Sequence, residues 1–227
     1  MPNIFKNKNY NLKKNIINKK LILDFNSELE KYINNLIKKN RLLINKKLSI
    51  NVKLLALEEI NHKYIAHIYG AIKQFKSFQK IYNNKKLLLI SKKYLAKNIK
   101  LFTKAVRLDL SNNTKWNLEW HQENSYVDSK NKFLFFWFPL LNDNDAITGG
   151  LNIYDKPTSK AYKIRKIHNK NSQAQKIPEF DFKKKYVNEL RLKLGDVLIF
   201  DRYLLHKSVT NFSYKSKISC VLSYYQA

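Results

Sequence analysis

The sequence predicts an α+β fold that is mainly β, with helices in the first half of the chain and short strands in the second. Three observations favour this fold. Apolar residues repeat at helical spacing in the first half, the pattern changes near Lys104 to short runs rich in β-branched and aromatic residues, and turn-forming residues separate those runs. Many short strands of this kind are typical of a sandwich or a jelly roll.

The helical half is expected over residues 21–100. The first helix is predicted in NSELEKYINNLIKKN, with Asn26 or Ser27 as its N-cap and apolar residues at helical spacing behind it. A second helical region is predicted over residues 54–82, where a nearly unbroken apolar stripe follows the 3.6-residue helical period. A third, short helix is expected in LLLISKKYLAKNIK.

The β half is expected over residues 104–227. Its strands are predicted in AVRLDL, FLFFWFPLL, GGLNIYD, ELRLKLGDVLIFD and KISCVLSYY. The stretch 155–189 is polar and irregular, so we expect a long substrate-facing loop there, with His168 solvated. Residues 1–20 are rich in lysine and asparagine, and we expect a basic, loosely ordered tail ahead of a single domain over 21–227.

The composition argues against a disordered, a membrane-spanning and a nucleic-acid-binding protein. Of the 227 residues, 44% are hydrophobic and 13% aromatic, too many for a disordered chain, and no apolar run approaches the roughly 20 residues that cross a bilayer. The formal net charge is +27, but lysine is spread along the chain and arginine is scarce, so we expect neither a specific nucleic-acid partner nor a membrane partner. Cys220 is the single cysteine, which indicates a reducing, cytoplasmic setting.

A candidate metal site starts with His121 and Glu123, in the stretch KWNLEWHQENSYV at 115–127. We predict a strand there, and side chains two residues apart on a strand project from the same face, so both can reach one metal ion. His206, in GDVLIFDRYLLHKSVTN, is the best candidate for a third ligand. Two imidazoles and one carboxylate form a facial triad that holds non-haem Fe(II), and zinc uses similar ligands.

Three blocks of the sequence resemble the phytanoyl-CoA dioxygenase family, whose members are Fe(II)- and 2-oxoglutarate-dependent oxygenases. They are WHQE at 120–123, FWFPLLNDNDAITGGLNIY at 136–154 and LKLGDVLIFDRYLLHKSVTNFSYKSKIS at 192–219. Their order and approximate spacing match the family from about Arg107 to the C-terminus. The resemblance implies a double-stranded β-helix (jelly-roll) core over 104–227, with the N-terminal helices packed on one sheet.

The resemblance also implies roles for individual residues. His121, Glu123 and His206 are the expected iron ligands and catalytic residues. Lys217 stands where the family has the arginine that pairs with the distal carboxylate of 2-oxoglutarate, and Ser208 matches a hydroxyl that helps to bind the same carboxylate. The sequence departs from the family at two of these positions. Glu123 stands where the family has Asp, and Lys217 places a point-like ammonium charge where the family has the planar guanidinium of arginine. Both replacements keep the charge, so we expect an active enzyme.

Further candidates lie on the same strands. Arg107 either holds an anionic substrate or cosubstrate or pairs with Asp109 on the same face. Trp137 either belongs to the core or borders the cosubstrate pocket. Asp201 and Arg202 are candidates for orienting the distal histidine through hydrogen bonds.

The function implied by the resemblance is that of a 2-oxoglutarate-dependent dioxygenase. It would hydroxylate a small or carrier-linked metabolite and release succinate and CO2, with a small-molecule substrate and O2 as its partners. Two alternatives stay open. One is a cupin-like zinc hydrolase or isomerase with the same ligands, and the other is a basic jelly-roll module that binds without catalysis.

Overall fold

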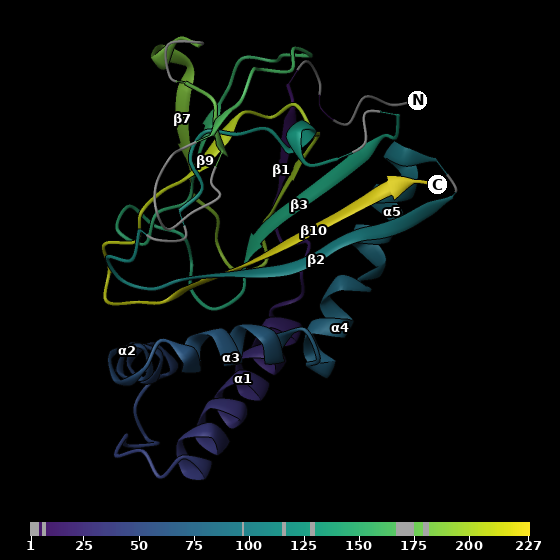
Figure 1. Cartoon of the computed structure of the whole chain (residues 1–227). Coiled ribbons are helices and arrows are strands. Elements are labelled where there is room, and N and C mark those ends of the chain that lie inside the picture. The colour runs from purple at the N-terminus through teal and green to yellow at the C-terminus, as the bar shows by residue number, and fades with distance from the viewer. Residues whose placement is uncertain are drawn as a thin grey trace.

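The computed structural model describes residue 5 and residues 8–96, 98–114, 117–127, 130–166, 175–178 and 182–227. Apart from the short strand at residues 10–13, the helices precede the strands in the chain, and they lie mostly below the strands in Figure 1. All of the pairings between described strands are antiparallel. None of the described helices has the combination of length and apolar character that would let it cross a membrane. The predicted α+β class is therefore confirmed.

The first helix starts well before the predicted caps Asn26 and Ser27. Asn18 caps it instead, because its side chain accepts a hydrogen bond from the first turn. The apolar face of the helix also extends upstream of the predicted start, since Ile22 and Phe25 are both buried in the main core. Asn26 and Ser27, which were expected to begin the helix, therefore lie inside it.

The predicted helical region 54–82 is divided into three helices. Asn61, with extended backbone angles of φ −167° and ψ 116°, ends the first of them, and Phe75, also extended, precedes the third. The helices are α1 (Lys19–Lys39), α2 (Ile50–Ile60), α3 (Lys63–Ile72), α4 (Lys76–Tyr82) and α5 (Lys85–Leu95).

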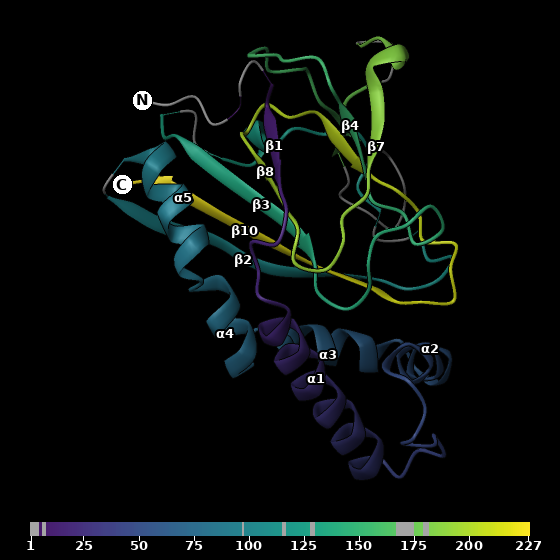
Figure 2. The same ribbon diagram turned by 180° about the vertical axis from the view of Figure 1, so that it is seen from behind.

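A five-stranded sheet has the order β1-β8-β3-β10-β2. Every residue of its central strand β3 is buried, because helices cover one face of the sheet and a second sheet covers the other. Leu134 and Phe136 contact the helical side, whereas Phe135 and Trp137 face the second sheet. Figure 2 shows α5 lying over the helical face. The strands are β1 (Tyr10–Lys13), β2 (Ile99–Asp109), β3 (Phe133–Pro139), β8 (Val197–Phe200) and β10 (Lys217–Gln226).

A three-stranded sheet in the order β7-β4-β9 packs on the open face of the larger one. Leu151 and Ile153 of this sheet share one apolar cluster with Phe135 and Trp137. Ile153 is paired with His206, so the register places that imidazole beside the layer between the sheets. The remaining elements among the described residues are β4 (Leu151–Tyr154), β5 (Arg165–Lys166), β6 (Gln175–Lys176), β7 (Val187–Leu190), β9 (His206–Ser208) and the 3-10 turns η1 (Glu123–Ser125) and η3 (Lys184–Tyr186).

The expected loop 155–189 is described in part. Its described residues include the two-residue strands β5 and β6 and the turn η3, and strand β7 begins before the loop was expected to end. Several of its side chains cover an apolar cluster with Trp120 on the outer side of the smaller sheet. His168 lies outside the described residues.

The segment expected to be a loosely ordered tail contributes to the fold. Its strand β1 pairs with β8 at the edge of the larger sheet, and Tyr10 and Leu12 pack on the apolar layer between the sheets. Ile17 is 1% exposed, and its amide donates to Gly195 O at 3.0 Å. Gly195 has a φ of +98°, and a Cβ there would lie 2.9 Å from Ile17 O, so glycine is required at this contact. The ordered domain therefore begins upstream of residue 21.

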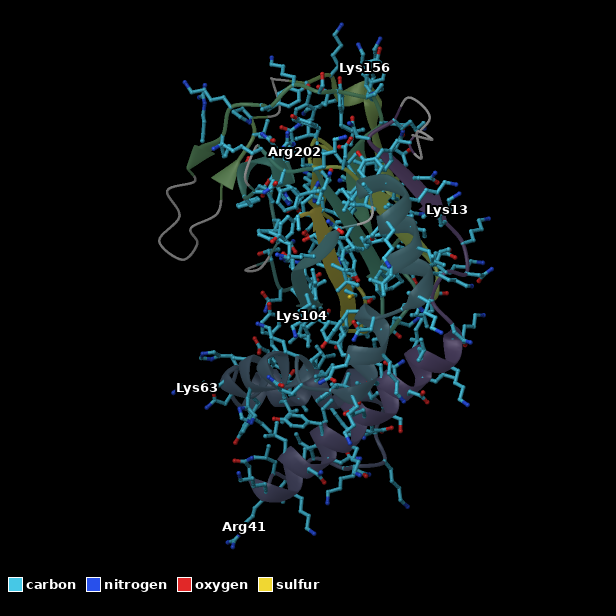
Figure 3. All side chains as sticks on the ribbon, turned by 90° about the vertical axis from the view of Figure 1, so that its right-hand side faces the viewer. Lys13, Arg41, Lys63, Lys104, Lys156 and Arg202 are labelled. Carbon is cyan, nitrogen blue, oxygen red and sulfur yellow. The ribbon has the colours of Figure 1, made fainter. Side chains whose placement is uncertain are left out.

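The positive charge is spread over the whole molecule. Figure 3 labels Arg41 and Lys63 in the helical part, Lys104 on β2 and Lys156 at the opposite end of the molecule. Basic side chains thus extend from both halves, as the scattered lysines of the sequence predicted.

Candidate metal centre

His121 and His206 lie directly opposite each other across an isolated antiparallel bridge. The amide of each residue donates to the carbonyl of the other, both at 3.0 Å. In a hydrogen-bonded pair of this kind the two side chains project from the same face. The imidazole ring centres are accordingly 4.2 Å apart.

The sequence predicted that Glu123 lies on a strand, but in the structure it begins the 3-10 turn η1. Gln122 anchors this turn, because its side-chain amide donates to Tyr203 O at 2.8 Å. The turn still brings the carboxylate to the imidazoles: Glu123 Oε1 lies 3.7 Å from His121 Nε2 and 3.6 Å from His206 Nε2. One ligand atom from each of the three residues lies within 4.8 Å of the others. The three side chains therefore meet as predicted, although the local geometry differs.

Both imidazoles are oriented by backbone carbonyls. His121 Nδ1 lies 2.6 Å from Glu119 O, and His206 Nδ1 lies 3.0 Å from Leu204 O. A carbonyl oxygen can only accept, so each Nδ1 carries the proton and each Nε2 of a neutral ring presents a lone pair. Two lone pairs and a carboxylate then point at one small space, an arrangement that a cation stabilises.

The protonation of the ligands fits metal binding. Burial lowers the pKa of His206 to about 3, and the neighbouring His121 adds to the effect, so His206 is neutral near pH 7. Burial raises the pKa of Glu123, but the neighbouring His121, His206 and Arg107 outweigh it, and the net shift is downward. A neutral imidazole and an ionised carboxylate are the forms that ligate a metal ion.

Tyr126 is a residue beside the ligands that sequence reasoning missed. Its ring centre lies 6.1 Å from that of His121, and the residue is 48% exposed. Burial of the hydroxyl and the charge of Glu123 raise the pKa of Tyr126, so the phenol stays neutral. Its place directly after η1 was visible in the sequence, but its direction depends on the turn.

The cations expected near the cosubstrate form a cluster with one carboxylate. Lys217 Nζ lies 3.4 Å from Asp109 Oδ2 and donates to Val209 O at 3.0 Å. Arg107 Nη2 lies 3.6 Å from Asp109 Oδ1, so the expected pairing of Arg107 and Asp109 on one face is present.

Ser208 and Trp137 lie on the two sheets that face each other. Ser208 is two residues after His206 on β9, and its hydroxyl accepts a hydrogen bond from Leu118 N at 3.2 Å. Trp137 is 4% exposed and belongs to the apolar cluster between the sheets. The tryptophan is therefore a core residue.

Asp201 and Arg202 were candidates for orienting His206 through hydrogen bonds, and the structure shows both bonded to the neighbouring Tyr203. Asp201 Oδ1 accepts from Tyr203 N at 2.8 Å, and Arg202 Nη2 donates to the Tyr203 hydroxyl at 3.1 Å. These bonds shape the turn before β9, and the imidazole of His206 donates from Nδ1 to Leu204 O. A backbone carbonyl leaves no mark in the residue types, so the sequence could not identify it.

No protein family and no curated protein matches this chain, whereas solved structures match almost all of it. ThoJ, a non-heme monooxygenase solved in its apo form, aligns with a TM-score of 0.68 and 13% identity over 98% of this chain and 75% of that protein. This chain shares its fold. HygX from Streptomyces hygroscopicus, with nickel and 2-oxoglutarate bound, has a TM-score of 0.61 and 12% identity over 97% of this chain and 84% of HygX.

EvdO2 from Micromonospora carbonacea var. aurantiaca, complexed with 2-oxoglutarate, has the same fold. It aligns with a TM-score of 0.62 and 12% identity over 98% of this chain and 88% of EvdO2. At such low identity these similarities establish the fold, and the resemblance to the phytanoyl-CoA dioxygenase family stays a prediction.

Proposed function

We propose that this chain is an Fe(II)- and 2-oxoglutarate-dependent oxygenase with a double-stranded β-helix core, related to the phytanoyl-CoA dioxygenases. The observation that carries the proposal is the convergence of His121, Glu123 and His206, with one ligand atom from each within 4.8 Å of the others. Two imidazoles and one carboxylate make the facial triad that suits Fe(II) and leaves coordination positions open. The fold shared with HygX and EvdO2, whose structures hold 2-oxoglutarate, supports the same assignment.

Iron and 2-oxoglutarate, when bound with O2, would supply an oxidative decarboxylation that releases succinate and CO2 and hydroxylates a small or carrier-linked substrate. The chain holds and orients these groups. The carbonyls of Glu119 and Leu204 fix both imidazoles. Phe200 packs on the imidazole of His206, with ring centres 5.2 Å apart, and excludes water from that side.

The cosubstrate is assigned to the space between the two sheets. Arg107 and Lys217, which share the carboxylate of Asp109, place positive charge on the inner face of the larger sheet. Ser208 lies on the same face of β9 as His206 and offers a hydroxyl to the same ligand. Trp137, on the facing sheet, forms part of the apolar wall.

An anaerobic titration with Fe(II) and 2-oxoglutarate tests the proposal. We expect a visible charge-transfer band that needs both components and disappears in His206→Ala. Lys207→Ala is the matched control, because Lys207 lies on the same strand but turns outward, with its ammonium 5.4 Å from the centre of the Trp120 ring. This variant should keep the band.

The same titration separates the alternatives. Tight zinc binding without a band in the unmodified protein would contradict the oxygenase and favour a zinc hydrolase or isomerase. Absence of any metal binding would favour a binding module. Succinate release that requires O2, measured across a panel of metabolites, would then identify the substrate.

A further inference from the structure

A buried charge cluster lies on the inner face of the larger sheet. Strand register pairs Lys217 with Asp109 and Ser219 with Arg107 across β10 and β2. Residues paired in this way share a face, and so do residues two apart along a strand. Val221 continues this face and packs on the apolar layer between the sheets. The cluster therefore faces the same interior as the candidate metal ligands.

Within this cluster the charge of Lys217 is directed at Asp109. The side chain of Lys217 is 3% exposed and that of Asp109 is 5% exposed, with 3.4 Å between Nζ and Oδ2. The ammonium also donates to Val209 O. Asp109 therefore neutralises Lys217 in a poorly solvated space, where the attraction between opposite charges is strong.

Arg107 is the accessible cation of the cluster. Its side chain is 24% exposed, against 5% for Asp109. Of the two cations on this face, the guanidinium is therefore the more exposed, since the side chain of Lys217 is 3% exposed.

Ser219 supplies an independent sign of a ligand. Its residue is 0% exposed, and its hydroxyl has no hydrogen-bond partner among the described residues. The same holds for Ser223, two positions along on the same face. A buried hydroxyl without a partner is unfavourable, and Ser219 stands opposite Arg107. An acceptor oxygen bound by Arg107 is placed to satisfy it.

We propose that Arg107, together with Ser219, binds the distal carboxylate of the 2-oxo dicarboxylate, while Asp109 positions Arg107 and Lys217 neutralises Asp109. This inference rests on the proposed function. It reassigns the role implied by the family resemblance: the lysine in the position of the family's arginine acts as a counter-ion, and a guanidinium on the neighbouring strand provides the planar fork for the carboxylate.

The test compares three variants and two ligands. Arg107→Met removes the guanidinium, Lys217→Met removes the counter-ion, and the double variant Lys217→Met/Asp109→Asn removes the whole ion pair at similar volume. Binding of 2-oxoglutarate to the Fe(II)-loaded protein is measured without O2 through the charge-transfer band. The matched ligand is 2-oxobutanoate, which has the same metal-binding end but no distal carboxylate.

We expect Arg107→Met to weaken 2-oxoglutarate binding roughly 10- to 100-fold, the range of a charged hydrogen bond, and to leave 2-oxobutanoate binding unchanged. Lys217→Met should also weaken 2-oxoglutarate, because Asp109 then neutralises Arg107. The double variant should recover to within about threefold of the unmodified protein, since a buried pair can be replaced by neutral groups. Ser219→Ala should weaken 2-oxoglutarate about fivefold.

Several outcomes overturn the inference. If the double variant binds 2-oxoglutarate as poorly as Arg107→Met, or if Arg107→Met binds as the unmodified protein does, Lys217 contacts the carboxylate directly. Fe(II) affinity and thermal unfolding of each variant show whether it is folded, and Arg107→Lys, expected to bind more weakly than arginine, replaces a variant that is not.

The proposed function fails differently. An unmodified protein that binds neither 2-oxo acid in the presence of Fe(II) refutes the oxygenase itself. Equal affinity for the two acids would leave the oxygenase standing and refute only the carboxylate site.

Discussion

Among the described residues, Lys53 in the helical half and Lys217 in the β half are both buried, and their surroundings differ. Lys53 Nζ lies 2.7 Å from Glu30 Oε1 and 3.0 Å from Asn34 Oδ1. The Glu30 side chain is 44% exposed. Lys217 lies 3.4 Å from a carboxylate that is itself 5% exposed, and a second cation shares that carboxylate.

The difference separates a structural ion pair from a candidate ligand site. Short bonds and a solvated carboxylate balance the charge of Lys53 within the helical layer. In the β half, Arg107 and Lys217 share Asp109 at longer distances, and buried hydroxyls nearby lack partners among the described residues. Buried groups with incomplete hydrogen bonding indicate where a ligand completes the structure.

Removing the shared carboxylate should have the largest effect. Asp109→Ala leaves Lys217 buried without its counter-ion, and we expect the free energy of unfolding to fall by about 3–5 kcal/mol. Urea denaturation followed by circular dichroism measures it. A loss below about 1 kcal/mol would mean that the pair contributes little and that the contrast with Lys53 is unfounded.

Metal binding should stabilise the β half next. At a free concentration about 100 times its dissociation constant, Fe(II) should raise the free energy of unfolding by about 2.7 kcal/mol, because it binds the folded chain alone. Thermal unfolding under anaerobic conditions, with and without a chelator, tests this. His206→Ala should show no such gain, and an equal gain in that variant would place the ion elsewhere.

Breaking the helical pair should cost less. Glu30→Ala should lower the free energy of unfolding by roughly 1–2 kcal/mol, because Asn34 still accepts from the Lys53 ammonium. Lys53→Met should be nearly neutral, since an apolar side chain of similar length fills the same space. Urea denaturation of both, beside Asp109→Ala, gives the ranking, and a loss from Glu30→Ala as large as that from Asp109→Ala would abolish the comparison.

The smallest effect concerns a pH-sensitive contact between helices. Glu28 on α1 accepts from Lys76 N at 3.1 Å and from Ser77 N at 2.9 Å, at the start of α4. Burial raises the pKa of Glu28, but the hydrogen bonds from Ser77 and Lys76 outweigh it and the pKa is lowered. Its contribution is therefore complete above the unfolded pKa of about 4.3 and is lost as the pH falls through the lower folded pKa.

Glu28→Gln keeps an acceptor but removes the charge. We expect a loss of about 0.5–1 kcal/mol at pH 7. Urea denaturation as a function of pH should show the difference between the two proteins vanishing in acid. A difference that persists at low pH would show that packing, and not charge, is responsible.

Sequence reasoning grouped the three candidate ligands because their residue types are informative. It placed His121, Glu123 and His206 at one site, and the structure brings them together. It did so through an assumed strand, whereas Glu123 lies in a 3-10 turn. The i, i+2 argument thus reached the correct grouping by a geometry that the chain does not adopt.

Features that depend on distant pairing were not predictable. The residue types of YNLK do not predict a strand. Strand β1 forms because its backbone pairs with β8, which is distant in the sequence. The pairing of Asp109 with Lys217 follows from the register of β2 and β10, which residue patterns do not reveal. The carbonyls that orient the imidazoles are invisible for a simpler reason, since every residue has one.

The bridge between His121 and His206 consists of two backbone hydrogen bonds, which join His121, outside the named strands, to the first residue of β9. A metal ion bound by both imidazoles would join the same two segments a third time. Removing the ion with a chelator would therefore make the segment from residue 117 to 127 less rigid. Protease cleavage within that stretch would then report metal content directly. The metal ion would then stabilise the local structure as well as take part in the reaction.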